Sequence, residues 1–237
     1  MEAISPCTPV VPHAIAGHPA ILLDVDLGVR RVRLHAVRDL EALVDRGALL
    51  RGEIEPPYWA HLWSGASVLA AYLARCVPLA GRRVLEIGCG LALPGVTAAT
   101  LGADVTLVDA APDALAFAAA SAAANGVRCV VAAADFTRLD PGWRFDVVLA
   151  AEIAYDRERW GELAAVCERH LAPGGATYLA DGYRTDTRGF WAALGARGLA
   201  VHAMDLRPAE EGRRVSVRIA EIRRPIVRPR GTPRPAP

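Results

Sequence analysis

The chain has 237 residues, a length at which one α/β domain with a sizeable core is ordinary. Its formal net charge is +1 and 53% of its residues are hydrophobic, so no long-range field favours nucleic acid or an acidic membrane surface. No uninterrupted apolar run approaches the roughly 18 residues of a membrane-spanning helix. Residues 1–12 lack the basic and apolar regions of a secretory signal. We therefore expect a cytoplasmic protein that binds neither membrane nor nucleic acid.

The chain contains no lysine, which excludes Schiff-base catalysis by its own side chains and a phosphate-binding P-loop. Its five cysteines occupy positions 7, 76, 89, 129 and 167. They include no Cys-x-x-Cys pair and no partner cluster of histidines. We therefore expect reduced thiols in the core, with no disulfide and no metal site.

The first elements form an extension ahead of the core. Residues 1–19 carry four prolines and are expected to be irregular. Residues 20–24 and 31–35 are short apolar segments on either side of a turn, and they predict a small hairpin.

Two helices are predicted next. Asp39 is expected to cap a short helix that Gly47 stops. Residues 58–75 predict a longer helix, whose start is dense in aromatic residues. We expect Trp59 to pack in the core, since large aromatic side chains dominate buried area wherever they occur.

A strand, a glycine turn and a helix then follow one another directly. Residues 84–87 predict a buried strand, Gly88-Cys89-Gly90 a turn and residues 94–101 a helix. This arrangement brings backbone N–H groups and a helix N-terminus close to a ligand. A purely structural turn is the alternative.

The residues around this turn narrow the ligand class. The third glycine position of a dinucleotide fingerprint is Leu93 here, which disfavours a pyrophosphate. Glu86, just before the glycines, would repel a phosphate. An acid at this place suits a ligand with a cationic end, such as the amino and sulfonium groups of S-adenosylmethionine.

Two further predicted strands, over residues 104–109 and 128–134, also lead to acids. They are separated by an alanine-rich helix over residues 111–125. Asp109 lies 23 positions after Glu86, near the spacing of about 20 residues at which a strand-end acid accepts ribose hydroxyls. Asp135 follows the third strand.

The second half of the chain continues the alternation of strands and helices. The predicted elements are a strand over 145–150, a helix over 157–171 stopped by Pro173-Gly174-Gly175, a strand over 176–180, a helix over 187–196, and strands over 199–206 and 215–222. Residues 223–237 hold five arginines, five prolines and no acid, and they predict a disordered tail. A role of this tail in binding nucleic acid or an anionic surface is the less favoured alternative.

The chain resembles the class I, seven-β-strand S-adenosylmethionine-dependent methyltransferases. More narrowly it resembles family 16, which holds the non-SET protein lysine methyltransferases and their bacterial relatives. The resemblance spans roughly residues 56–182 and rests on residues 57–66, 84–90, Val108-Asp109, Asn125-Gly126 and the Glu-x-x-Tyr of 152–155. It implies an α/β fold with a Rossmann-like, doubly wound sheet of seven strands. That sheet is mostly parallel with an antiparallel last strand, and helices cover both faces.

The resemblance also implies a domain organisation. Residues 56–222 are expected to form the S-adenosylmethionine-binding methyltransferase domain. Residues 1–55 form an N-terminal extension that covers the active-site mouth and contributes to substrate selection, or serves only as a packing strap. Residues 223–237 form the tail.

The implied site lies at the carboxyl ends of the strands. The expected cofactor-binding residues are Trp63, Glu86, Gly88, Gly90, Asp109, Ala110, Asp135, Phe136 and Ala151. Glu86 and the glycine backbone would hold the amino-acid portion of S-adenosylmethionine, and Asp109 the ribose hydroxyls. Asp135 would accept from the adenine amino group while Phe136 covers the ring. Trp63 is expected to close over the methionine end.

Glu152 and Tyr155 are the expected catalytic residues. Glu152 would orient the acceptor amine and help its proton leave, or else only contact the cofactor or cap a helix. Tyr155 would shape the pocket.

The sequence departs from the family pattern at three positions. Ala92 replaces the usual third glycine, which is acceptable with a negative φ. Phe136 replaces a tryptophan and should stack more weakly. Glu152 replaces an aspartate and reaches one methylene further.

The leading functional hypothesis is an S-adenosylmethionine-dependent methyltransferase that modifies a lysine or another nitrogen of a protein. A small-molecule N- or O-methyltransferase on the same fold is the alternative, because fold does not determine the acceptor. A non-catalytic protein that holds the cofactor is a third possibility. The oligomeric state is left open.

Overall fold

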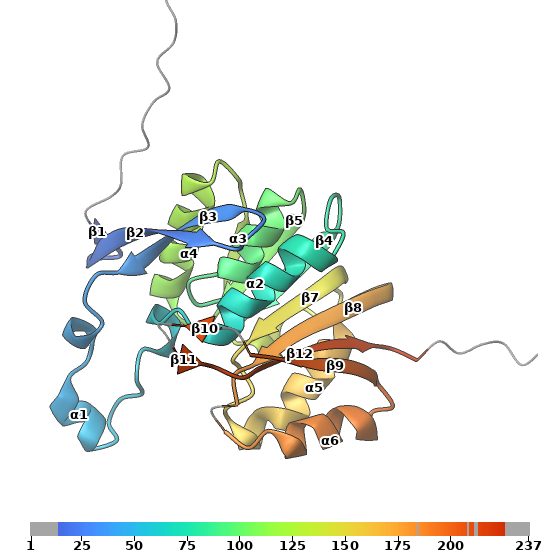
Figure 1. Cartoon of the computed structure of the whole chain (residues 1–237). Helices are drawn as coiled ribbons and strands as arrows, with labels where there is room; N and C mark the ends of the chain where they lie inside the picture. Colours follow the sequence, from blue (N-terminus) through green and yellow to red (C-terminus); the bar gives the residue numbers. More distant parts are fainter. Residues whose placement is uncertain (1–13, 184, 208, 211–212, 226–237) are drawn as a thin grey trace, which may run out of the picture.

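The computed structural model describes residues 14–183, 185–207, 209–210 and 213–225. A seven-stranded sheet forms its centre (Figure 1). In spatial order its strands are β6 (Val130–Ala133), β5 (Asp104–Asp109), β4 (Arg83–Ile87), β7 (Phe145–Ala151), β8 (Leu171–Asp181), β12 (Val217–Arg223) and β9 (Ala200–Leu206). β12 runs antiparallel to both of its neighbours, and the other pairs are parallel. The predicted sheet is confirmed.

Helices cover both faces of the sheet (Figure 1). α2 (Ser64–Cys76), α3 (Leu93–Thr100) and α4 (Pro112–Ala124) pack on one face, and α5 (Trp160–Arg169) and α6 (Arg188–Ala196) on the other. Alternate residues of β4 reach the two cores: Val84 packs with the first group, Leu85 and Ile87 with the second. Within the described residues, no helix has the length and apolarity to cross a membrane.

The N-terminal hairpin is confirmed and packs on α4. β1 (Ala14–Ile15), β2 (His18–Asp26) and β3 (Arg31–Val37) form an antiparallel sheet of three strands. The irregular structure expected for residues 14–19 is therefore wrong, because a turn at Ala16-Gly17, with φ of 50° and 82°, reverses the chain there. Residues 1–13 lie outside the described residues.

The short helix after the hairpin begins later than predicted. Asp39 precedes only a 3-10 turn over Glu41–Leu43. The α-helix is α1 (Arg46–Leu50), and the Asp45 carboxylate accepts a backbone N–H of its first turn at 2.9 Å. Gly47 lies inside this helix rather than after it. Either aspartate can satisfy the free N–H groups of a helix start, and the sequence does not say which one does.

Two further helix boundaries differ from the prediction. α2 begins only at Ser64, after a 3-10 turn over Tyr58–Ala60. α5 ends at Arg169, and Pro173-Gly174-Gly175, expected to stop it, lies inside β8. A Cβ on Gly175 would come within 2.9 Å of the Asp146 carbonyl oxygen, so this glycine lets β8 approach β7 closely.

The four described cysteines are free, as expected, but not all are in the core. Cys89 and Cys167 are buried, whereas Cys76 is exposed where α2 ends. Cys7 lies outside the described residues, as do residues 226–237 of the predicted tail. β12 extends to Arg223, the first residue assigned to that tail.

Asn125 at the end of α4 hydrogen bonds both backbone groups of Arg33 in β3. Its Oδ1 accepts from Arg33 N at 2.9 Å, and its Nδ2 donates to Arg33 O at 2.6 Å. Asn125→Ala should lower the free energy of unfolding by about 1–3 kcal/mol, because both backbone groups lose their partner. Urea denaturation measures this, with Asn125→Asp, which keeps only the acceptor, expected in between. Equal stability of Asn125→Ala and wild type would contradict the assignment.

Candidate active site

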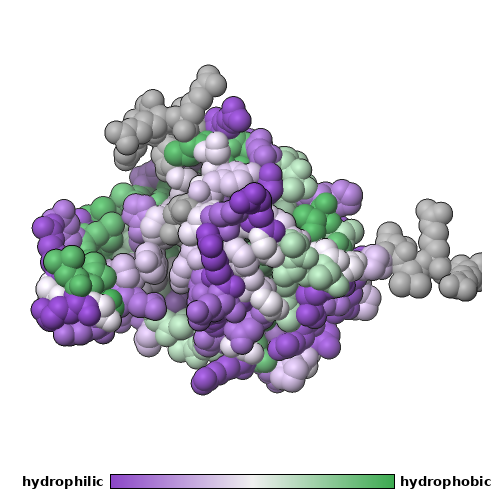
Figure 2. All heavy atoms as spheres, turned by 90° about the horizontal axis from the view of Figure 1, so that it is seen from below, coloured by the Kyte–Doolittle hydropathy of each residue, from purple (hydrophilic) through white to green (hydrophobic). Residues whose placement is uncertain are grey.

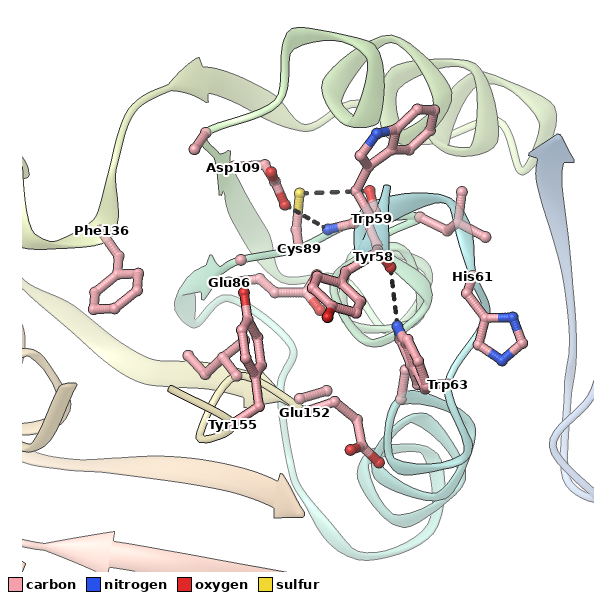
Figure 3. Close-up of a pocket in the computed structure, with 18 of the residues that line it drawn as sticks. Tyr58, Trp59, His61, Trp63, Glu86, Cys89, Asp109, Phe136, Glu152 and Tyr155 are labelled. Carbon is pink, nitrogen blue, oxygen red and sulfur yellow. Dashed lines mark hydrogen bonds between the residues drawn. The ribbon is translucent and has the colours of Figure 1, made fainter. Parts of the chain in front are cut away.

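One pocket of about 190 Å³ opens at the carboxyl ends of β4, β5, β6 and β7 (Figure 3). All eleven predicted site residues line it: Trp63, Glu86, Gly88, Gly90, Asp109, Ala110, Asp135, Phe136, Ala151, Glu152 and Tyr155. This is the point where the strand order reverses between β4 and β7, the usual ligand crevice of open α/β sheets. The described part of the N-terminal extension contributes no lining residue, since the first one is Tyr58.

Glu86 is the most deeply buried acid of the pocket, with 1% of its surface exposed. Its Oε2 accepts the N–H of Gly95, in the first turn of α3, at 2.9 Å. Burial raises the pKa of Glu86 to about 8, against the Gly95 hydrogen bond and with the help of the nearby Asp109 charge. Within the described residues, no arginine or histidine forms an ion pair with it.

Asp109 ties the tip of β5 to the glycine turn. Its Oδ2 accepts from Gly90 N at 2.8 Å and its Oδ1 from Ala111 N at 2.9 Å. Burial raises the pKa of Asp109 despite these hydrogen bonds. Each carboxylate oxygen keeps a second lone pair, which leaves acceptor capacity for a diol.

The glycine turn is tighter than expected. Gly88, Gly90 and Ala92 have φ of 57°, 50° and 60°. The negative φ required of Ala92 is therefore not observed, and the alanine sits in the left-handed region that favours glycine. The turn forces this conformation, because Ala92 N donates to Cys89 O at 2.7 Å while α3 begins at the next residue.

Asp135 is held by two partners before any ligand arrives. Its Oδ1 accepts from Thr137 N at 2.9 Å, from Thr137 Oγ1 at 2.8 Å and from Arg159 Nη2 at 2.6 Å. Burial alone would raise the pKa of Asp135, but these hydrogen bonds outweigh it and place the pKa below its ordinary value. Asp135 is thus an ionised acceptor at neutral pH.

Glu152 sits at the junction of three elements. It follows β7, has a φ of 58°, and its N–H donates to Ala180 O at the end of β8 at 2.9 Å. Its Oε1 accepts from Gly65 N, in the first turn of α2, at 3.0 Å. The carboxylate is directed away from Asp109 (Figure 3). Glu152 therefore caps the N-terminus of α2, the role considered as the alternative for it. A negative charge at this end of the helix also interacts favourably with the helix dipole.

Two glycines enclose the Glu152 carboxylate. A Cβ on Gly65 or on Gly182 would come within 2.4 Å of its Oε1. The carboxylate therefore lies in a slot between the start of α2 and the segment after β8. A larger residue at either position would displace it.

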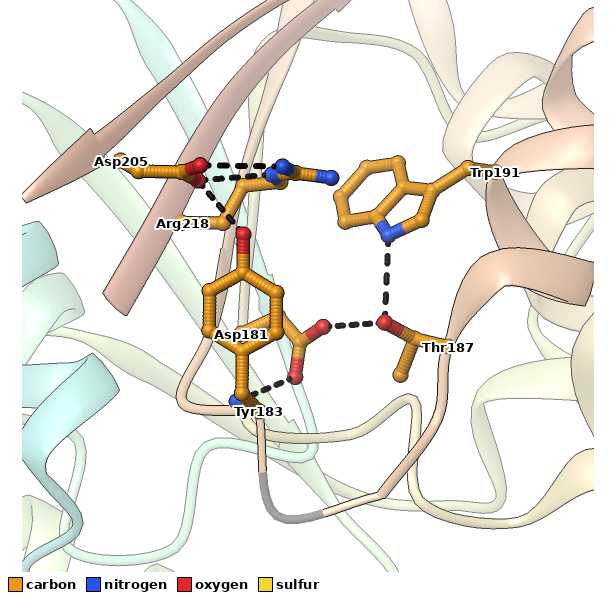
Figure 4. A network of polar contacts seen from close by, with 6 residues as sticks. All are labelled: Asp181, Tyr183, Thr187, Trp191, Asp205 and Arg218. Atoms are coloured by element: carbon orange, nitrogen blue, oxygen red, sulfur yellow. Dashed lines mark hydrogen bonds and ion pairs between the residues drawn. The ribbon is translucent and has the colours of Figure 1, made fainter. Parts of the chain in front are cut away.

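A polar network fixes the segment after β8 that carries Gly182. Its members are Asp181, Tyr183, Thr187, Trp191, Asp205 and Arg218 (Figure 4). The buried Asp181 carboxylate accepts from Thr187 Oγ1 at 2.5 Å and from Tyr183 N at 3.2 Å. Tyr183, with a φ of 56°, donates its hydroxyl to Asp205 Oδ1 at 2.6 Å. The network thereby holds the neighbour of Gly182 in a strained conformation.

Aromatic side chains from residues 58–63 form the outer wall. Trp63 donates its indole N–H to Tyr58 O at 2.9 Å. The rings of Tyr58 and Tyr155 lie 5.3 Å apart, and these residues are 38% and 42% exposed. Trp59 packs on Phe117 with ring centroids 5.5 Å apart, the core role expected for it.

Sequence reasoning missed two contributors to this site. Arg159 lines the pocket and pairs with Asp135, but in the sequence it is one charge within Asp156-Arg-Glu-Arg, a pattern typical of a solvated surface. Gly182 lies against the Glu152 carboxylate from the segment after β8, and no local signal in the sequence marks it.

The hydrogen-bond acceptors of the pocket fit an adenosyl amino acid. The carboxylates of Glu86, Asp109 and Asp135 line the pocket, and such groups can accept hydrogen bonds from a cationic amino group, a ribose diol and an exocyclic amine. Gly90 has a backbone close to Trp59, and a Cβ there would come within 3.0 Å of the Trp59 carbonyl oxygen. This fit is to S-adenosylmethionine, the cofactor that the sequence resemblance implies.

Comparisons with known proteins point the same way. Residues 84–175 match the family described as "Methyltransferase domain". A protein N-lysine methyltransferase of Danio rerio, METTL21A, is 37% identical over 129 residues, which cover 51% of this chain and 58% of that protein. A ubiquinone biosynthesis O-methyltransferase of Xanthomonas euvesicatoria pv. vesicatoria is 33% identical over 132 residues, covering 54% and 55%. The chain thus spans little more than half the length of these relatives.

Solved structures share the fold. The N-methyltransferase NodS of Bradyrhizobium japonicum, in complex with S-adenosyl-L-homocysteine, has a TM-score of 0.57 at 18% identity, covering 78% of this chain and 96% of that chain. The magnesium protoporphyrin IX methyltransferase ChlM of Synechocystis, with bound S-adenosylhomocysteine, has a TM-score of 0.54 at 18% identity, covering 68% and 81%. The chain thus carries a methyltransferase domain over residues 84–175, and its topology is the fold of the class I S-adenosylmethionine-dependent methyltransferases.

Proposed function

We propose that the chain transfers a methyl group from S-adenosylmethionine to a lysine or another nitrogen of a protein. The observation that carries the choice of a protein acceptor is the open, partly acidic mouth of the pocket. Tyr58 and Tyr155 stand half-exposed there. Burial raises the pKa of the Tyr155 phenol, and the charges of Glu55 and, less strongly, Asp156 raise it further, while the charge of Arg159 lowers it. Two carboxylates near the mouth favour the approach of a cationic side chain.

A projecting apolar segment next to the mouth supports a macromolecular acceptor. Leu50, at the end of α1, is 89% exposed, and Ile54 is 41% exposed. Figure 2 shows hydrophobic residues gathered on this projecting part of the surface, at the left of the view. The chain leads from here directly into Tyr58. Exposed apolar groups of this kind are typical of protein-contact surfaces.

Each of the three acids at the strand tips binds a different part of the cofactor. Glu86 pairs with its amino group, Asp109 accepts its ribose hydroxyls and Asp135 its adenine amine, while Phe136 stacks on the ring. Gly88, Gly90, Ala110 and Ala151 give the close approach that small side chains allow. Trp63 closes over the methionine end. When bound, S-adenosylmethionine supplies an electrophilic methyl carbon on a sulfonium.

The task left to the chain is to align a neutral amine with that carbon. A lysine amine has an unperturbed pKa of about 10.4 and must first lose its proton. Glu152, on the pocket wall beyond β7, orients the amine and helps its proton leave, and Tyr155 shapes the access path. The extension over residues 1–55 acts indirectly in substrate selection, because His18 in β2 lies against Trp59, with ring centroids 6.1 Å apart.

A small-molecule N- or O-methyltransferase is the second candidate. It is favoured by the ubiquinone biosynthesis O-methyltransferase among the relatives and by the aromatic side chains of the pocket wall, where the rings of His61 and Trp63 lie 4.4 Å apart. A non-catalytic cofactor-binding role is less favoured, since Glu86, Asp109 and Glu152 are all retained.

Incubation with radiolabelled S-adenosylmethionine and cell lysate tests the acceptor class. Label should enter protein and appear as a methylated lysine or other methylated nitrogen after hydrolysis, and Asp109→Ala should abolish the incorporation. Label confined to small molecules would instead establish the second candidate. Absence of any transfer, with the cofactor still bound, would leave only the non-catalytic role.

Binding of S-adenosylhomocysteine should release protons from Glu86. Because the pKa of Glu86 lies at about 8 in the free protein, the carboxyl is mostly protonated at pH 7 and must ionise to pair with a cationic amino group. Calorimetry in buffers of different ionisation enthalpy should show release approaching about one proton per site at pH 7 and little above pH 9. Glu86→Gln should bind without this release. A wild type that binds with no proton release would refute the pairing.

Glu152 variants separate charge from helix capping. Glu152→Ala should lower the rate of protein labelling about 100-fold or more while S-adenosylhomocysteine affinity stays within a few-fold. Glu152→Gln keeps an oxygen for the Gly65 N–H but loses the charge, so its labelling rate should fall nearly as far, with stability close to wild type. Normal turnover of the glutamine variant would leave Glu152 a purely structural role.

A further inference from the structure

Arg159 joins two loops across one end of the pocket. It ends a 3-10 turn over Arg157–Arg159, and its guanidinium reaches Asp135, the acid that follows β6, at 2.6 Å. Glu162 Oε2 lies 3.6 Å from its Nε on the other side. Two carboxylates therefore fix the orientation of one guanidinium group at the pocket wall.

The same guanidinium stacks on Phe136. Its central carbon lies 4.3 Å from the centre of the phenyl ring, and both residues line the pocket. A guanidinium is planar, stacks on aromatic faces and is more weakly hydrated than an ammonium group. Phe136 alone offers a smaller stacking surface than a tryptophan would. Arg159 covers one face of this ring, so a flat ligand that approaches from that side would meet the outer face of the guanidinium.

We propose that Arg159 is a nucleobase-binding residue, whose guanidinium, backed by the ring of Phe136, provides the stacking surface for the adenine ring of the cofactor. This inference rests on the proposed binding of S-adenosylmethionine. Protein sites hold bases on aromatic rings and on arginine guanidinium planes alike, and a purine face attracts a cation. The Asp135 pair serves to hold the guanidinium in place, while the planar group itself touches the base.

Calorimetric titration with S-adenosylhomocysteine tests this without any acceptor. Arg159→Ala should raise the dissociation constant about tenfold, the effect of losing one stacking partner of a base. Arg159→Lys keeps the charge opposite Asp135 but loses the plane, so it should weaken binding nearly as much. Arg197→Ala is the matched control, since Arg197 forms a comparable ion pair with Glu168 away from the pocket, and its dissociation constant should equal that of wild type.

A second ligand separates stacking from support of Asp135. S-inosylhomocysteine lacks the exocyclic amine, so Arg159→Ala should weaken its binding by the same factor if the guanidinium stacks on the purine. The double variant Phe136→Trp, Arg159→Ala should bind S-adenosylhomocysteine within about threefold of wild type, because the larger ring restores the surface.

The outcomes are distinct. Unchanged binding by both Arg159 variants overturns the proposal, as does a loss seen with S-adenosylhomocysteine but absent with S-inosylhomocysteine, which would make Arg159 only a positioning residue for Asp135. If the wild type bound neither ligand, the proposed cofactor itself would be wrong.

Discussion

A buried carboxylate with one hydrogen bond from the chain is the constraint around which the site is built. Glu86 is held out of water at the tip of the central strand by the N-terminus of α3, and Gly95 has no side chain because a Cβ would strike the carboxylate. A buried charge without a counter-ion is costly, so burial raises the pKa of Glu86 to about 8 and favours its protonated form at neutral pH. Burial destabilises the ionised carboxylate in the free protein, and a ligand with a positively charged group would relieve this cost. The site therefore favours a cationic ligand.

The other acids of the pocket each tie their strand tip to a neighbouring segment. Asp109 holds the glycine turn, Asp135 holds Arg159, and Glu152 holds the start of α2. Each carboxylate thus has structural partners before a ligand binds, which preorganises its remaining oxygen lone pairs. Alanine substitutions at these positions remove both roles together, whereas amide substitutions at Asp135 and Glu152 keep an accepting oxygen and remove the charge; Asp109 accepts with both oxygens, so an amide there loses one hydrogen bond. The tip of each strand is rigid because its acid is already bonded, and the ligand then meets fixed acceptors.

The sequence predicts this core well because its signals are local. Short apolar runs followed by acids mark β4 and β5, and the spacing of Glu86 and Asp109 marks them as neighbours. The predictions were wrong where two nearby residues could play the same role, or where contact with a strand distant in the sequence determines the role of a residue. In the sequence, Asp39 and Asp45 are equally good candidates for the helix cap, and only the structure shows that Asp45 is the cap. Gly175 allows β8 to approach β7 closely and does not end a helix. Arg159 acquires its role only when two loops far apart in sequence meet at Asp135, which no periodicity encodes.

Backbone strain marks the side of the pocket that the cofactor acids do not occupy. Glu152 and Tyr183 follow the adjacent strands β7 and β8, and both adopt positive φ although neither is glycine. Such conformations cost free energy and persist only where the surroundings enforce them. Here the enforcing contacts are the bond from Glu152 to α2 and the bond from Tyr183 to Asp205. A purely structural cap at α2 would not require a strained residue, since serine or aspartate at the usual position supplies it without strain. The strain therefore indicates that the fold maintains the position of the Glu152 side chain for more than capping α2.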